Sequence, residues 1–384
     1  MKSKNSNFVM LKNLISTPSF SGEEANTADL IYGFLCERGV KTHRFLNNVW
    51  AKNKHFSPEK TTLLLNSHHD TVKPSPAYFR NPFEPVIENG KLYGLGSNDA
   101  GGSVVALLSV FCDLYEKLLP YNIVIAITAE EEAICKNGIS ALWQHLGKID
   151  FAIVGEPTGM QAAIAERGLI VLDCIAEGIS GHAARNEGEN ALYKAIDDIL
   201  WFRDYKFPKV SKLMGKVKMT VTVIQSGTQH NVIPSKCEFI VDIRPTDCYC
   251  NEEIVDIIRA NVKSCITPRS LHLKASAIPE EHILVKTAES LNIQCYVSPT
   301  TSDISRINVP AIKMGPGNSI RSHTANEFIY IEEIETAVKL YKTFLEKLGK
   351  ISSNLPCQEG TVSNEQSQTL SITDSQSPAG TTLY

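Results

Sequence analysis

The sequence predicts an α/β protein whose mixed, mostly parallel sheet is flanked by helices, with a second, α+β domain inserted into it. Three observations lead to this prediction. Short, continuously apolar runs alternate with helical patterns in the first half of the chain, the rhythm changes near residue 165, and the first rhythm returns after residue 276. Apolar runs of this length are typical of strands covered on both faces, as in a parallel sheet.

The first part of the larger domain spans residues 1–164. Ser21 followed by Glu24 forms a capping-box pattern, and Gly39 is a stop signal, so a helix is expected over 22–38. Asn89-Gly90 between apolar runs predicts a hairpin over 86–94. The remaining elements expected here are strands over 61–66, 121–128 and 151–155 and a helix over 104–118.

The inserted domain is expected over residues 165–276. Its pattern gives, in order, strand 168–177, helix 188–203, strands 217–226 and 234–243, helix 251–264 and strand 270–275. This order is that of the split βαβ, or ferredoxin-like, sandwich.

The chain then returns to the first sheet over residues 277–347, which would make the larger domain discontinuous. Helices are expected over 280–291 and from residue 331 onward, with short strands at 295–298 and 310–315 between them. Residues 348–384 are rich in Ser, Thr and Gln and poor in large apolar side chains, so a disordered tail is predicted.

Composition excludes several classes of function. The 38 basic and 42 acidic residues are spread along the chain and leave a net charge of −4, so no basic stripe suits nucleic acid. No segment is apolar enough to predict a membrane span or a cleaved signal peptide. The ten cysteines form no C-x-x-C pair. We expect a soluble, cytoplasmic protein that binds neither nucleic acid nor membrane.

Polar side chains gather where the predicted strands end. His68 and Asp70 end the strand "LLLNSHHD" and point to one face, whereas His69 points to the other. A carboxylate behind an imidazole is a common arrangement for a metal ligand, although a hydrogen-bonded polar pair would show the same pattern. Asp99 lies in the glycine-rich loop "GLGSNDAGG", where a turn and helix cap is the plainer alternative.

Further acidic and imidazole groups follow later strands. Glu130, Glu131 and Glu132 come directly after "YNIVIAIT", where a solvated helix start is the alternative interpretation. Glu156 follows "FAIVG", and His323 lies in the loop after "PAIKM". Open α/β sheets gather their sites at the carboxyl ends of strands. Together these side chains predict a hydrolase site for zinc, cobalt or manganese ions, because the ligands are nitrogen and oxygen only.

These motifs resemble a known family. The segments "SHHDTV", "KLYGLGSNDAGG", "TAEEE", "GEPTG", "GISGHAARNEGENAL", "GTQHNVIP", "DIRP" and "MGPGNSIRSH" occur in the order of the co-catalytic zinc aminoacylases and metallopeptidases. That family includes acetylornithine deacetylase, succinyl-diaminopimelate desuccinylase and carboxypeptidase G. The resemblance covers roughly residues 5–347 and implies a zinc-exopeptidase-like sheet whose inserted domain is a lid and dimerisation domain.

The resemblance implies a role for each site residue. One divalent metal ion, preferably zinc, would bind His68, Asp99 and Glu156. The other would bind Asp99, Glu132 and His323. Glu131 would be the general base and acid, and Asp70 the partner of His68.

Three residues of the inserted domain also match the family. His182 in "SGHAAR" resembles the lid histidine that reaches a neighbouring active site to stabilise the oxyanion. Arg244 in "DIRP" resembles the arginine that grips a substrate carboxylate, and Asn231 resembles a lid residue near the substrate. From the bare sequence, His182 would be a loop histidine and Arg244 a surface cation.

The chain departs from the family pattern at three places. Glu130 stands where the family has aspartate, Gly101-Gly102 replaces lysine-glycine, and Asn326 replaces an aspartate. None of these changes removes a metal ligand.

The expected function is hydrolysis of an N-acetyl or N-succinyl amino acid by a homodimer. The motifs are most similar to acetylornithine deacetylase, which implies conversion of N-acylornithine to ornithine in arginine biosynthesis. Succinyl-diaminopimelate desuccinylase and a dipeptidase or carboxypeptidase are the alternatives within the family. A catalytically silent dimeric binding protein is the alternative outside enzymes.

Overall fold

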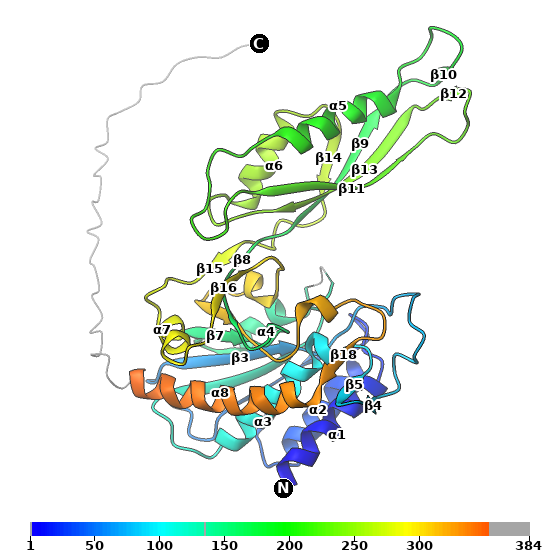
Figure 1. Ribbon diagram of the computed structural model, residues 1–384. Helices are drawn as coiled ribbons and strands as arrows, with labels where there is room; N and C mark the ends of the chain where they lie inside the picture. Colours follow the sequence, from blue (N-terminus) through cyan, green and yellow to red (C-terminus); the bar gives the residue numbers. More distant parts are fainter. Residues whose placement is uncertain (1, 134–135, 353–384) are drawn as a thin grey trace, which may run out of the picture.

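The computed structural model describes residues 2–133 and 136–352, and it has a larger part and a smaller one (Figure 1). The larger part is built from both ends of this range, and the smaller part comes from the middle of the chain. Helix α8 (Ile331–Ser352) runs beyond residue 347, so the tail expected from residue 348 does not begin there. The rest of that expected tail, 353–384, lies outside the described residues.

The larger part contains a nine-stranded mixed sheet. Strand β3 (Thr62–His68) is paired in parallel with β6 (Asn122–Thr128) on one side and β7 (Phe151–Val154) on the other. Strand β17 (Ala311–Lys313) is parallel to β7, which confirms the mostly parallel centre. The other strands are β1 (Thr42–Phe45), β2 (Asn48–Lys52), β8 (Ala162–Glu166), β15 (Ser276–Ala277) and β16 (Cys295–Ser298).

Helices cover both faces of this sheet. Alternate residues of its buried strands point to opposite sides, so both faces carry apolar side chains that must be covered. Leu63 and Leu65 pack in the larger core, whereas Leu64 packs in a second core with helix α4 (Ile139–Leu146). The larger core is formed with α1 (Lys2–Ser16), α2 (Ala25–Cys36), α3 (Gly102–Leu114), α7 (Ile283–Ser290) and α8. No helix in the described part of the chain is long and apolar enough to cross a membrane.

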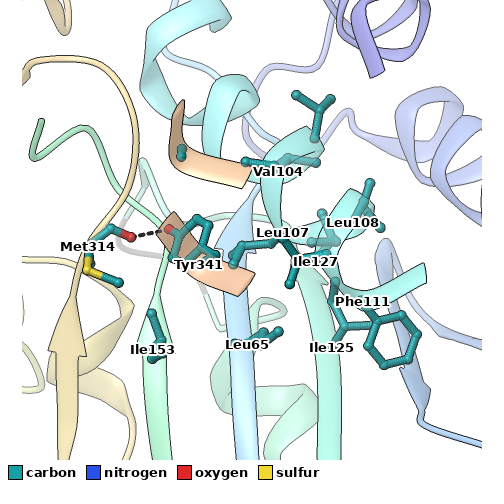
Figure 2. Close-up of a cluster of buried hydrophobic side chains, with 14 of the residues drawn as sticks. Leu65, Val104, Leu107, Leu108, Phe111, Ile125, Ile127, Ile153, Met314 and Tyr341 are labelled. Atoms are coloured by element: carbon teal, nitrogen blue, oxygen red, sulfur yellow. Dashed lines mark hydrogen bonds between the residues drawn. The ribbon is translucent and has the colours of Figure 1, made fainter. Parts of the chain in front are cut away.

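Figure 2 shows part of the larger core, where the sheet meets α3 and α8. Leu107 and Phe111 of α3 lie beside Leu65 and Ile125 of the sheet, and all four are fully buried. The hydroxyl of Tyr341 on α8 donates to the backbone carbonyl of Met314, directly after β17. This packing fixes the ends of the central strands against rigid helices.

The smaller part has the predicted split βαβ order. Its four-stranded sheet runs β11–β13–β9–β14, and all neighbours are antiparallel. Helices α5 and α6 pack on this sheet around a separate apolar core (Figure 1). The elements are β9 (Ile170–Glu177), α5 (Ala191–Asp204), β11 (Lys218–Ser226), β13 (Lys236–Arg244), α6 (Asn251–Arg259) and β14 (Cys265–Pro268).

Two short pieces complete the arrangement. The predicted hairpin is confirmed as β4 (Val86–Glu88) and β5 (Lys91–Tyr93), and β18 (Phe328–Tyr330) pairs with β5. Asn89 and Gly90 both have positive φ, as this two-residue turn requires. At the far tip of the smaller part, β10 (Gly181–His182) pairs with β12 (Val232–Ile233) (Figure 1).

Two expected elements of the inserted domain were wrong in position. The strand expected over 270–275 lies earlier, at Cys265–Pro268, where Ile266 is buried in the core and Leu271 packs against that core only partly buried. The preceding helix therefore ends at Arg259 instead of 264. The side chain of Asn251 donates to the carbonyls of Leu271 and Leu273, which holds that segment as a loop.

The predicted capping box does not form. The hydroxyl of Ser21 donates to the carboxylate of Asp70 at 2.7 Å, a charge-assisted bond that is stronger than one to a helix amide. Glu24 is itself the residue before α2, so the helix begins at Ala25 instead of 22. Ser21 therefore supports the site residues instead of the helix.

Candidate metal centre

The side chains of the candidate metal centre converge at one edge of the central sheet. His68 is the last residue of β3, and the loops after β6 and β7 carry Glu131, Glu132 and Glu156. The parallel pairing of β3 with both strands brings these ends together. Asp99 precedes α3, in the short segment η1 (Ser97–Gly101), whose backbone is not helical at Asp99, and the peptide bond to Ala100 is cis.

Asp99 lies between two histidines. Its Oδ1 atom is 3.3 Å from Nε2 of His68, and its Oδ2 atom is 3.7 Å from Nε2 of His323. Nε2 of His68 is also 3.7 Å from Oε1 of Glu156. Nε2 of His323 lies 2.9 and 3.0 Å from the two oxygens of Glu132. The five side chains predicted as metal ligands therefore form one continuous cluster.

The donor atoms of this cluster fit divalent metal ions. His68, Glu131 and Glu156 offer ligand atoms within 4.8 Å of one another, and so do His68, Asp99 and Glu132. Imidazole nitrogen and carboxylate oxygen are ligands that zinc, cobalt and manganese accept. Four carboxylates at such short range also need cationic charge, because like charges repel strongly in a buried site.

The pKa values of the site reflect this crowding of acidic groups. Burial raises the pKa of Glu156 to about 8, and burial with the neighbouring carboxylates raises the pKa of Glu131 well above its usual range. The hydrogen bond to Glu132 raises the pKa of His323 to about 9. Without a metal ion the site therefore retains protons, which a bound cation would displace.

Asp70 connects His68 to the loop that carries the glutamates. Nδ1 of His68 lies 3.1 Å from the backbone carbonyl of Asp70 and 3.4 Å from its carboxylate, so Nδ1 carries a proton and Nε2 is the nitrogen that faces the candidate metal centre. The carboxylate also accepts the amides of Glu131 and Glu132, each at 3.0 Å. Burial opposes ionisation, but the contact with His68 and the donors of Ser21 and Glu131 lower the pKa of Asp70 to about 2.

The neighbouring residues His69 and Glu130 face away from the cluster. Nε2 of His69 lies 2.9 Å from the carbonyl oxygen of Asn47, and its Nδ1 lies 2.9 Å from the hydroxyl of Thr27. This is the opposite side of β3, as strand alternation predicts. The carboxylate of Glu130 accepts the backbone amide and the side-chain amide of Asn137. Of the three consecutive glutamates, the second and third thus face the candidate centre.

The residues predicted from the inserted domain do not join this cluster within the described chain. His182 is exposed in β10, at the tip remote from β3 (Figure 1). The carbonyl of Asn231 accepts the amide of Ala183 in the same ribbon. Arg244 ends β13 and forms a bidentate pair with Asp242. Any part these three play therefore needs a bound substrate, a domain movement or a second subunit.

Sequence reasoning missed two residues that hold the site loops. Arg306 donates to the backbone carbonyls of Glu130, Glu131 and Ala133, at 3.1, 3.4 and 2.9 Å. Glu327 is buried beside Asp99, and burial raises its pKa to about 8. Both side chains bind backbone groups that are far away in the sequence. A backbone group is the same at every residue, so no sequence motif marks these contacts.

A cavity of about 310 Å³ opens beside the cluster. Four of the five candidate ligands line it together with Glu131, and these four are Asp99, Glu132, Glu156 and His323. Polar side chains also line the cavity, namely Lys313 and hydroxyl groups that include Thr158, Ser298, Thr300 and Thr301. Lys313 is buried and forms an ion pair with Glu166 at 3.0 Å. The cavity can therefore hold a small polar molecule against the candidate metal centre.

Comparison with known proteins assigns the family. The model of peptidase family M20/M25/M40 matches residues 64–347, which is most of the chain and includes every residue of the cluster. The chain belongs to this family. It is a metallohydrolase whose candidate metal centre is the buried cluster of histidine, aspartate and glutamate.

Curated relatives of this M20-family chain are similar over nearly their whole length. A LysW-lysine/LysW-ornithine hydrolase of Sulfurisphaera tokodaii is 29% identical over 349 residues, covering 88% of this chain and 94% of the relative. A succinyl-diaminopimelate desuccinylase of Wolbachia pipientis is 27% identical over 392 residues, covering 92% and 96%. The first name describes a hydrolase of LysW-lysine and LysW-ornithine, and the second describes removal of a succinyl group from succinyl-diaminopimelate.

Solved structures confirm the fold. A tripeptidase from Staphylococcus aureus superposes with a TM-score of 0.74 at 19% identity, covering 90% of this chain and 99% of the other. An M20 family metallo-carboxypeptidase from Sulfolobus solfataricus gives a TM-score of 0.70 at 19% identity, with the same coverage. The sheet with its inserted smaller domain is thus the architecture of these enzymes.

Proposed function

We propose that this M20-family chain is an amidohydrolase with two divalent metal ions that removes an N-acyl group from an amino acid. The observation that carries the proposal is the place of Asp99, with one carboxylate oxygen toward His68 and the other toward His323. A carboxylate so oriented can bridge two cations. Zinc is the preferred ion, with cobalt or manganese as alternatives.

The geometry supports a division of the ligands between two ions. His68, Asp99 and Glu156 would hold the first. Asp99, Glu132 and His323 would hold the second. Glu131 is then the carboxylate of the cluster left for proton transfer, although its distance from His68 and Glu156 would also allow it to be a ligand.

The reaction needs a base that later becomes an acid. When bound, the two cations supply positive charge that acidifies a water molecule and stabilises negative charge on the substrate carbonyl. Glu131 takes the proton from the attacking water and then gives it to the leaving amine. Glu131 lines the cavity beside the candidate ligands, where this proton transfer would take place.

The smaller domain supports a homodimer. Tyr193, Ile196 and Leu200 lie along the outer face of α5 and are 68, 40 and 40% exposed, although this helix packs its other face on the sheet. Edge strand β11 beside it exposes Val223 and Ile224. A second copy of the chain would cover this surface and pair with the free strand edge. His182 would then reach the partner's site and donate to the oxyanion.

For the substrate we propose N-acetylornithine or N-succinylornithine, which would give ornithine for arginine biosynthesis. The polar cavity wall with Lys313 suits a small substrate that carries charged groups, and Arg244 and Asn231 would contact that substrate from the lid. Relatives named for hydrolysis at ornithine and for desuccinylation support this substrate class. Succinyl-diaminopimelate is the second candidate, followed by a dipeptide or other carboxypeptidase substrate.

We also propose a cytoplasmic location. The eight cysteines in the described part of the chain are free, as a reducing compartment requires.

The test is amine release from a substrate panel after metal reconstitution. Protein loaded with zinc, cobalt or manganese is offered N-acetylornithine, N-succinylornithine, N-succinyl-diaminopimelate and dipeptides, and metal-free protein serves as control. We expect metal-dependent release, fastest from an N-acylornithine. Release from dipeptides alone would reject the deacylase, and two bound ions without any hydrolysis would favour a silent binding protein.

A further inference from the structure

Glu327 connects the two segments that supply Asp99 and His323. It follows His323 by four positions, and its side chain is 2% exposed. Its Oε1 atom accepts the backbone amides of Asn98 and Asp99, each at 2.8 Å. Its Oε2 atom accepts the amide of Gly96 at 3.0 Å. One buried carboxylate thus holds three amides of the loop that carries the candidate bridging aspartate.

The main chain of Glu327 is itself fixed. Its amide donates to the hydroxyl of Tyr78 at 3.2 Å, and its carbonyl accepts the amide of Gly94 at 3.0 Å. The next residue, Phe328, begins β18 and is paired with Tyr93 of β5. Because both ends of the connection are anchored, the carboxylate defines where the Asp99 loop lies relative to the chain after His323.

A second tie joins the same two segments. The side chain of Asn98 accepts the amide of Asn318 at 2.9 Å and donates to the carbonyl of the same residue at 3.1 Å. Asn318 precedes the 3-10 helix η3 (Ser319–Arg321) in the loop that leads to His323. The loop at Asp99 and the loop at His323 are therefore held as one unit, by three hydrogen bonds of the Glu327 side chain and two of the Asn98 side chain.

The chemistry of the position calls for a carboxylate. Three backbone amides converge on the two oxygens of Glu327, so both oxygens must accept, whereas a glutamine would turn its own NH₂ donor toward at least one amide. Burying a carboxyl group is costly, and in the described chain no lysine or arginine is paired with Glu327 to offset that cost. A residue needed only for packing would not require this arrangement.

We propose that Glu327 is a positioning residue that holds Asp99 in its bridging orientation and thereby sets the affinity for the second metal ion. This inference rests on the proposed two-metal function. The second ion would take two of its three ligands, Asp99 and His323, from the segments that Glu327 connects. The first ion would take only Asp99 from them, so it should depend less on Glu327.

The matched control is Asp198 of the smaller domain. It is also a buried carboxylate that holds backbone amides, those of Lys263 at 3.0 Å and Ser264 at 2.8 Å, but it lies in the core of the other domain. Asp198→Asn should destabilise the fold to an extent similar to Glu327→Gln. It should leave metal binding unchanged.

The experiment is calorimetric titration of zinc into metal-free full-length wild type, Glu327→Gln and Asp198→Asn. We expect the second zinc ion to bind Glu327→Gln about 10- to 100-fold more weakly, the range measured for groups that orient metal ligands, with a smaller change for the first ion. If circular dichroism shows that Glu327→Gln is unfolded, Glu327→Asp replaces it, because its shorter side chain withdraws the carboxylate from the amides and should weaken the second ion likewise.

The outcomes separate this inference from the proposed function. Two ions bound to folded Glu327→Gln with wild-type affinities would overturn the role of Glu327 and leave the two-metal enzyme standing. An equal loss in Asp198→Asn would also overturn it, because the effect would then be one of general stability. Failure of the wild type to bind a second zinc ion would overturn the two-metal function and this inference together.

Discussion

The imidazole of His323 lies against the carboxylate of Glu132, with Nε2 2.9 and 3.0 Å from its two oxygens, although 191 positions separate the residues. This contact places two possible metal-ligand atoms, Nε2 of His323 and a carboxylate oxygen of Glu132, close together beside Asp99. The contact defines the proposed second ion site.

His323→Ala should reduce the bound zinc from two ions per chain to about one, because the second ion loses one of its three protein ligands. Elemental analysis after dialysis against a low zinc concentration measures the ratio. His55→Ala, which removes an exposed histidine, is the control and should keep both ions. Two zinc ions in His323→Ala would remove this histidine from the ligand set.

Glu131→Gln should keep both metal ions and lower kcat by about 10²- to 10⁴-fold, the usual contribution of a general base and acid. Glu130→Gln is the adjacent control, since its carboxylate faces Asn137 and not the cluster. Steady-state amine release together with metal analysis tests both variants. A Glu131→Gln protein that loses a metal ion would show that Glu131 is a ligand, as its distance from His68 and Glu156 also allows.

Asp70→Asn should weaken metal binding by about 10- to 100-fold, because the carboxylate behind a histidine ligand fixes the ring and raises its basicity. The variant also replaces one acceptor of the amides of Glu131 and Glu132 with a donor. Competition with a zinc chelator of known affinity measures the change. Unaltered competition would mean that the bond from His68 to the Asp70 carbonyl is sufficient.

The stability of the metal-free protein should depend on pH through His69. Burial lowers the pKa of His69 to about 4 from 6.5 in the unfolded chain. The unfolded state therefore binds a proton more readily than the folded state. The stability that neutral His69 contributes to the fold is complete above about pH 6.5 and is lost as the pH falls toward about 4. Between about pH 7 and about pH 5 the loss is ~2 kcal/mol.

Urea unfolding of wild type and His69→Gln, both metal-free, isolates this effect. The difference in unfolding free energy between the two proteins should shrink by ~2 kcal/mol from about pH 7 to about pH 5. A difference that stays constant with pH would show that His69 does not resist protonation in the fold.

Subunit mixing should reveal whether His182 acts on the partner's site. In the proposed homodimer, the His182→Ala and Glu131→Gln proteins should each be nearly inactive. A mixed dimer would contain one complete site, formed by Glu131 of the first variant and His182 of the second. Unfolding and refolding an equimolar mixture should restore about a quarter of wild-type activity, because half of the dimers are mixed and each has one working site. No recovery would place His182 at its own chain's site or outside the reaction.

Much of the candidate site could be predicted because it follows strand ends. His68, Glu132 and Glu156 come directly after apolar runs, and parallel pairing brings such ends to the same edge. Asp99 and His323 lie in loops, and they were included because those loops also gather at the predicted strand ends. The family resemblance added which metal ion each would bind. His69 was separated from His68 by strand alternation alone.

The residues that hold the site loops could not be predicted from spacing. Glu327 and Arg306 bond to backbone groups more than 170 positions away, and a backbone amide or carbonyl looks the same at every residue. Ser21 was misassigned for a related reason. Its sequence matches a helix cap, but the carboxylate of Asp70 is a stronger partner that only the tertiary fold brings near.

The measurement that tests the two-metal account most directly is anomalous X-ray diffraction from crystals of the zinc-loaded protein. The account predicts two zinc peaks on either side of the Asp99 carboxylate, one beside His68 and Glu156 and the other beside Glu132 and His323. A single peak, or peaks that do not share Asp99, would contradict it.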